Sequence, residues 1–134
     1  MTALTRFFFR SPYLAPAPRE IVHWWESRRP MYNVAVGIAG LITSSTITLS
    51  ELLVTGQLRI PPWQAVAIYA VIANVAYSMG PAADLTIVRR WGGQFAAIGP
   101  ALFRYGFVFA IGVTLLPIPL IVLSTIIRLL NLFE

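Results

Sequence analysis

The amino-acid sequence predicts an all-α membrane protein, in which a short interfacial amphipathic helix precedes three transmembrane helices. Three stretches contain no charged residue, namely Pro30–Ser50, Ile60–Ala83 and Tyr105–Ile127. Each is longer than the about 20 residues that a helix needs to cross the hydrocarbon core of a bilayer. The composition agrees, because 57% of the residues are hydrophobic and 11% are charged, whereas soluble domains average about 25% charged residues.

The chain is expected to divide into an arm, a short helix and a membrane domain. Residues 1–18 form a cytoplasmic arm that contains proline and aromatic residues. Residues 19–29 are expected to form a helix that lies in the membrane plane, because their apolar side chains cluster on one face and most of the charged ones fall elsewhere. Residues 30–134 form the transmembrane domain. Its three spans lie at about 31–52, 62–83 and 103–128.

The distribution of arginine predicts the orientation in the membrane. All ten basic residues are arginine. Five of them lie in Met1–Arg29, one in Glu51–Pro62, three in Asp84–Arg104 and one, Arg128, in the C-terminal tail. Because arginine-rich flanks stay in the cytoplasm, the N-terminus is predicted to be cytoplasmic and the C-terminus to lie on the outer side. The arginines are scattered among the span ends and do not cluster on one soluble face, so nucleic acid is not expected as a partner.

Aromatic and arginine side chains near the span ends are expected to anchor the protein at the headgroup level. Trp and Tyr combine an apolar body with a polar tip, and Arg binds phosphate with two parallel hydrogen bonds. The expected lipid and interface anchors are Trp24, Trp25, Arg28, Arg29, Tyr32, Trp63, Arg89, Arg90, Trp91 and Arg104.

Small residues at helical spacing occur on all three spans and indicate faces for close helix packing, because packing drives helix association in lipid. The expected packing residues are these small residues and one amide, Asn74, near the middle of the second span. They are Ala35, Gly37, Ala39, Gly40, Asn74, Ala76, Gly80, Gly106 and Ala110. The amide of Asn74 is expected to bond a neighbouring helix, and a substrate contact is the alternative. The hydroxyls of Thr43–Ser50 either bond back to carbonyls one turn earlier, face a partner helix or pigment, or line a water path.

Prolines predict breaks in the second and third spans. Pro81 is expected to kink or end the second span, after which Asp84 caps a short amphipathic piece, Leu85–Trp91. Pro117 and Pro119 are expected to bend the third span.

Residues that could carry chemistry are few. The sequence has no cysteine, and no charged residue falls in the central part of a span. His23, the only histidine, is expected to be interfacial, with a pigment or haem ligand as the alternative. No catalytic or metal motif is present. We therefore predict no enzyme, no catalytic or metal residues and no intrinsic cofactor. Lipid contacts are expected, with pigment or quinone contact through a partner as a further option.

Three short stretches carry recognisable patterns. Trp24–Asn33 contains W-E-x-x-R-x-x-Y-N, Ala73–Pro81 contains A-N-x-x-Y followed by G-P, and Phe107–Pro117 contains F-x-x-x-x-T-L-L-P. Together they cover roughly a quarter of the chain and resemble parts of small uncharacterised polytopic proteins of the bacterial inner membrane. The resemblance implies three or four spans in the bacterial inner (cytoplasmic) membrane and implies no activity. In that membrane, the orientation predicted from arginine makes the C-terminus periplasmic. Pro30 interrupts the first pattern and argues against a continuous helix from Trp24 into the first span.

These observations favour a structural or accessory subunit of a larger bacterial integral-membrane complex, of respiratory or photosynthetic type. The expected partners are membrane lipid and other integral-membrane subunits. The alternative is a homo-oligomeric transporter or channel for a small molecule or lipid, which would use the hydroxyls of Thr43–Ser50 and the proline-bent third span.

Overall fold

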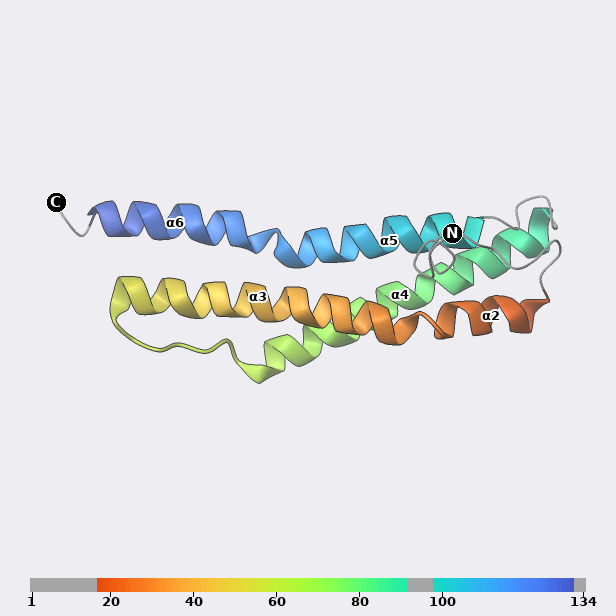
Figure 1. The fold of residues 1–134 in the computed structure, drawn as a ribbon, viewed down its shortest axis with the longest axis horizontal. Helices are drawn as coiled ribbons and strands as arrows, with labels where there is room; N and C mark the ends of the chain where they lie inside the picture. Colours follow the sequence, from red (N-terminus) through yellow and green to blue (C-terminus); the bar gives the residue numbers. More distant parts are fainter. Residues whose placement is uncertain (1–16, 92–97, 132–134) are drawn as a thin grey trace, which may run out of the picture.

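A computed structural model describes residues 17–91 and 98–131, and this part of the chain is helical without strands. The helices are α2 (Pro18–Glu26), α3 (Arg29–Thr55), α4 (Trp63–Trp91), α5 (Ile98–Leu115) and α6 (Pro117–Asn131) (Figure 1). The predicted all-α class is therefore confirmed. The predicted arm lies, apart from its last two residues, outside the described residues.

The helices form three rods that are long and apolar enough to cross a membrane. These are Pro18–Thr55, Trp63–Trp91 and Ile98–Asn131. Figure 1 shows α3 running beside α5 and α6 in the same direction, while α4 returns obliquely across them. The start of α2 and the end of α6 consequently lie at opposite ends of the bundle, as a chain with three spans requires.

Glycine and proline mark most of the helix ends. Gly56 ends α3 in the left-handed conformation, with φ of 69°, and its N–H bonds the carbonyl of Leu52. A side chain would strain this conformation, which explains the glycine. At the other break, α5 ends at Leu115 and α6 begins at Pro117. Figure 1 shows a change of direction there, which confirms the predicted bend in the third span.

The second span differs from its prediction. Pro81 lies inside α4, which continues without interruption to Trp91, and Pro81 is buried. Proline removes the N–H that would bond the carbonyl of Tyr77, yet contacts with neighbouring helices can compensate for such a loss. Asp84 is therefore an interior residue of a long helix, and its expected role as the cap of a separate piece, Leu85–Trp91, is wrong.

The short N-terminal helix also lies differently from the expectation. It covers Pro18–Glu26, and Ser27 and Arg28 separate it from α3. Figure 1 shows α2 continuing along the long axis of α3, beside the end of α4. Its apolar side chains, Ile21, Trp24 and Trp25, are buried against the other helices. The predicted apolar face is present, and these three residues pack on other helices of the chain, whereas Val22 is exposed.

The core of the bundle is aromatic at the α2 end and polar near the other end. Trp25 and Phe103, each 2% exposed, are the most buried members of the aromatic part. Towards the far end, Thr43 Oγ1 donates to the carbonyl of Thr114 over 2.7 Å, and the hydroxyls of Ser50 and Thr125 bond each other. Thus two of the hydroxyls of α3 join it to α5 and α6, while others, such as Thr46, bond back within α3.

Candidate functional site

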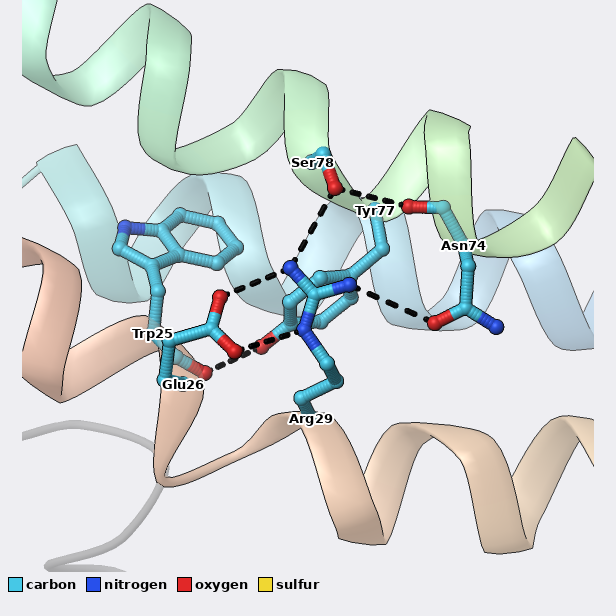
Figure 2. Close-up of polar contacts among 6 residues, drawn as sticks. All are labelled: Trp25, Glu26, Arg29, Asn74, Tyr77 and Ser78. Atoms are coloured by element: carbon cyan, nitrogen blue, oxygen red, sulfur yellow. Dashed lines mark hydrogen bonds and ion pairs between the residues drawn. The ribbon is translucent and has the colours of Figure 1, made fainter. Parts of the chain in front are cut away.

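Polar side chains gather at the aromatic end of the bundle, where α2, α3 and α4 meet (Figure 2). The C-terminal turn of α2 supplies Trp25 and Glu26, the first residue of α3 is Arg29, and the middle of α4 supplies Asn74, Tyr77 and Ser78. We refer to these six residues as the polar junction.

Arg29 is the centre of the polar junction. Its Nε donates to Glu26 Oε2 over 2.8 Å and its Nη2 to Glu26 Oε1 over 2.7 Å, which is a bidentate ion pair. On the α4 side, Nη1 donates to Asn74 Oδ1 over 3.4 Å and Nη2 to Ser78 Oγ over 3.3 Å. The guanidinium carbon lies 4.8 Å from the centre of the Tyr77 ring. Figure 2 shows the guanidinium group between Glu26 and α4.

This arrangement places an ion pair against the second span. Asn74 lies near the middle of the charge-free stretch Ile60–Ala83, and the guanidinium group of Arg29 reaches it. The sequence had placed Arg29 at the headgroup level. Because Glu26 pairs with Arg29 and the amide and hydroxyl of α4 accept two further hydrogen bonds from it, the charge is compensated within the polar junction.

A second polar contact is buried beside the junction. Asp84 is 6% exposed, and its Oδ2 accepts a hydrogen bond of 3.0 Å from Trp25 Nε1, although the two residues lie 59 positions apart. A Cβ added to Gly99 of α5 would lie 2.5 Å from the same oxygen. Glycine at this position therefore leaves room for the carboxyl group between α2, α4 and α5.

The end of α2 is closed by side chains from elsewhere. The carbonyl of Trp25 accepts a hydrogen bond of 2.6 Å from the hydroxyl of Tyr77, and the carbonyl of Trp24 accepts one of 2.9 Å from Arg28 Nη1. Arg28 also lies over the Trp24 ring, 3.8 Å from its centre. The last carbonyls of a helix lack partners within it. The hydrogen bond from Tyr77 joins the end of α2 to α4, and the contacts of Arg28 close the end of α2 locally.

The predicted anchors fall into two groups. Trp24, Trp25, Arg28 and Tyr32 are 7%, 2%, 7% and 4% exposed, so they pack within the chain and do not form the expected lipid contacts. Trp63, Arg89, Arg90 and Trp91 are exposed, as anchors would be. Arg29 belongs to the polar junction, and Arg104 is half-buried, with its Nε 3.4 Å from the carbonyl of Pro100.

The predicted packing residues also separate. Ala39 is buried, Ala35 is half-buried, and Gly80 packs against the Trp25 ring. Asn74 Nδ2 bonds the carbonyl of Ala70 within α4, while its oxygen accepts from Arg29. The remaining residues lie on outward surfaces: Ala76, Gly106 and Ala110 line an apolar groove between α4 and α5, and Gly37 and Gly40 meet open space.

Ligand-binding residues for a metal are not assembled in the described part of the chain. His23 is exposed on α2. Within residues 17–91 and 98–131, no group of three or more His, Asp or Glu side chains is placed to hold a metal ion.

Sequence reasoning missed the contacts of Asp84, Tyr77 and Phe103. For Tyr77, the available signal was the pair of patterns Trp24–Asn33 and Ala73–Pro81, which the structure brings together in the polar junction. Neither pattern by itself indicates that the two stretches are neighbours, and Asp84 and Phe103 lie outside both.

The described part of the chain is an α-helical fold with three helices long and apolar enough to span a membrane, as in a multi-pass membrane protein, and α2 packs against α4. No protein-family model, curated protein or solved structure matches the chain.

Proposed function

We propose that the protein is an accessory subunit of a larger integral-membrane complex of the bacterial inner membrane. The observation that carries this proposal is a face of α3 that combines glycines in open space with polar side chains that have no hydrogen-bond partner among the described residues. Its first half is exposed, and its second half is half-buried beside Ile60 and Pro61. The proposed complex is of the respiratory or photosynthetic type.

The face consists of residues spaced three or four positions apart, which places them on one side of a helix. In chain order these are Asn33, Gly37, Gly40, Ser44 and Thr48. We call them the α3 face. A Cβ added to either glycine would meet no atom within 4 Å. Among the described residues, the side chains of Asn33, Ser44 and Thr48 have no hydrogen-bond partner.

Such a face is unfavourable when lipid covers it. Each glycine inside a helix costs about 1 kcal/mol relative to alanine, and a lipid-facing hydroxyl or amide has no partner in hydrocarbon. A helix from another subunit would offset both costs. Glycine permits its close approach, and interhelical hydrogen bonds to the polar side chains contribute about 0.6–2 kcal/mol each. The α3 face therefore suits an integral-membrane partner better than lipid.

The polar junction supports the same proposal. Its charged and polar groups bond one another and thereby join α2, α3 and α4. A rigid scaffold that presents one open helix face is what docking into an assembly requires, since little conformational entropy is lost on binding.

Replacement of both Gly37 and Gly40 by isoleucine is expected to release the protein from its complex. The β-branched side chains would hold a partner helix away from the α3 face without disturbing the chain itself, because both positions open onto free space. The measurement is native mass and co-purification from mild detergent through a C-terminal tag.

Gly112→Ile is the matched control, because Gly112 also meets nothing within 4 Å but lies on α5. Co-purification should persist in this control. Unchanged co-purification in the double variant would contradict docking through the α3 face. A homo-oligomer of the 14.8 kDa chain, with no other subunit, would favour the alternative, a transporter or channel for a small molecule or lipid.

The orientation is tested separately. A reporter enzyme that works only outside the cytoplasm, fused after Glu134, is expected to be active. The arginine-rich flanks stay in the cytoplasm by the positive-inside rule, and this places the C-terminus on the outer side. The same reporter fused before Met1 should be silent. The reverse pattern would overturn the proposed cytoplasmic N-terminus and periplasmic C-terminus.

A further inference from the structure

The apolar groove between α4 and α5 has the size of a ligand site. Its volume is about 460 Å³, within the range of about 300–1,000 Å³ that is typical of small-molecule sites. Its walls combine larger apolar side chains, such as Ile72 and Phe109, with small residues, which are Ala76 and Gly80 on α4 and Gly106 and Ala110 on α5. Aromatic rings, among them Phe103, form its floor. The groove exists because the small wall residues lack side chains that could fill it.

The polar atoms in the groove lining already have partners. Tyr32 donates to the carbonyl of Ala73 and Tyr77 to the carbonyl of Trp25. Tyr69 bonds the hydroxyl of Thr114, and Trp25 Nε1 donates to Asp84. A ligand with a polar ring or a charged group would find no free donor or acceptor there, so the lining selects a hydrocarbon chain.

A positive charge lies beyond one end of the groove. Arg90 is exposed and follows Ala83, which lines the groove, by seven residues of α4. Seven residues are nearly two turns, so Arg90 lies on the same helix face about 10 Å further along. A phosphate joined to a chain in the groove would come within reach of this guanidinium group, which binds phosphate with high geometric specificity.

We infer that the groove between α4 and α5 binds one acyl chain of an anionic phospholipid, whose phosphate lies at Arg90. The surrounding bilayer supplies such chains, because both walls belong to helices that are long and apolar enough to span it. This site is separate from the α3 face, and its occupancy does not depend on the proposed docking.

The test uses vesicles of phosphatidylglycerol that contain a trace of the same lipid with a photoreactive diazirine in the middle of one acyl chain. After illumination, the labelled residues are mapped by mass spectrometry. Labelling is expected to concentrate on the groove and to fall about tenfold in Gly106→Leu, a loss equivalent to one decade in affinity. The leucine side chain would occupy the groove, and a Cβ at Gly106 meets no atom within 4 Å.

Gly112→Leu is the matched control, because this glycine is equally open but does not line the groove, and its labelling should be unchanged. Circular dichroism of both variants checks that they fold. Equal labelling of all lipid-facing positions, or groove labelling that Gly106→Leu leaves intact, would overturn the inference. An unlabelled groove would also overturn it, and would indicate a second copy or another segment of the chain as occupant.

Arg90→Gln tests the headgroup. Groove labelling by the phosphatidylglycerol probe is expected to fall about fivefold, the effect of one basic residue at an anionic surface. Labelling by a phosphatidylcholine probe in phosphatidylcholine vesicles should change less. Equal changes for the two lipids would contradict a phosphate contact at Arg90.

Discussion

Replacement of Trp25 by alanine is expected to lower the free energy of unfolding by about 3–5 kcal/mol, the usual cost of removing a large buried aromatic side chain. Trp25 is 2% exposed and makes edge-to-face contacts with Trp24, Tyr77 and Phe103, whose centres lie 5.5–5.9 Å from its own. Its ring joins α2 to α4 and α5. The variant should therefore lose the docking of α2 first.

The hydrogen bond from Trp25 to Asp84 contributes separately. Trp25→Phe keeps an aromatic ring but leaves the buried carboxyl group of Asp84 without its donor, which should cost about 1–3 kcal/mol. When Asp84 is first replaced by leucine, the same change should cost less, because no polar group is then left unpaired. The expected coupling energy is about 0.5–3 kcal/mol.

Unfolding by SDS in mixed micelles, followed by circular dichroism, measures the free energy of unfolding of the unchanged chain, Trp25→Phe, Asp84→Leu and the double variant. The single and double variants form a closed cycle with the unchanged chain. If the effects of Trp25→Phe and Asp84→Leu simply add, the hydrogen bond between these two side chains contributes nothing to stability.

The three spans and the break before Pro117 were predictable because they follow from properties of single segments. Length without charge identifies a span, and Pro117 favours a break because proline removes a backbone N–H and clashes with the preceding turn. Contact with other helices alters such local rules. At Pro81 the helix continues because the residue is buried among its neighbours, so the local preference of proline was overridden.

The orientation and packing of α2 and the role of Asp84 could not be predicted from the sequence. An apolar face with Trp24 and Trp25 is equally suited to lipid and to a protein core, because both are apolar. Only the partners distinguish them, and these are Tyr77 and Phe103, which belong to other helices. Asp84 likewise needs the indole of Trp25, 59 residues away, to be stable in the interior.

Small residues present the same ambiguity. Gly37 and Gly80 each lie three or four positions from another small residue, Gly40 and Ala76 respectively, and both were expected to pack against helices. The structure places Gly80 against the Trp25 ring inside the chain, whereas Gly37 lies on the α3 face with open space above it. Which glycine packs within the chain depends on how the helices rotate about their axes, and spacing does not determine this.

The two glycines should therefore respond to alanine with opposite signs. A Cβ at Gly80 would lie 2.5 Å from two carbons of the Trp25 ring. That ring cannot move freely, since Tyr77 and Phe103 surround it and Asp84 holds its N–H. Overpacking costs about 1–3 kcal/mol, and the better helix propensity of alanine returns up to about 1 kcal/mol. Gly80→Ala should thus destabilise the chain by up to about 2 kcal/mol, net of these two effects.

Gly37→Ala should stabilise the isolated chain by about 0.5–1 kcal/mol, because only the helix propensity changes when no atom lies within 4 Å of the new methyl group. The same SDS titration measures both variants in detergent, without partner subunits. Equal effects of the two substitutions would mean that the Trp25 ring can shift away from α4. That outcome would contradict the packing by which the aromatic end of the bundle holds α2 against α4, and with it the rigid scaffold from which the α3 face is presented.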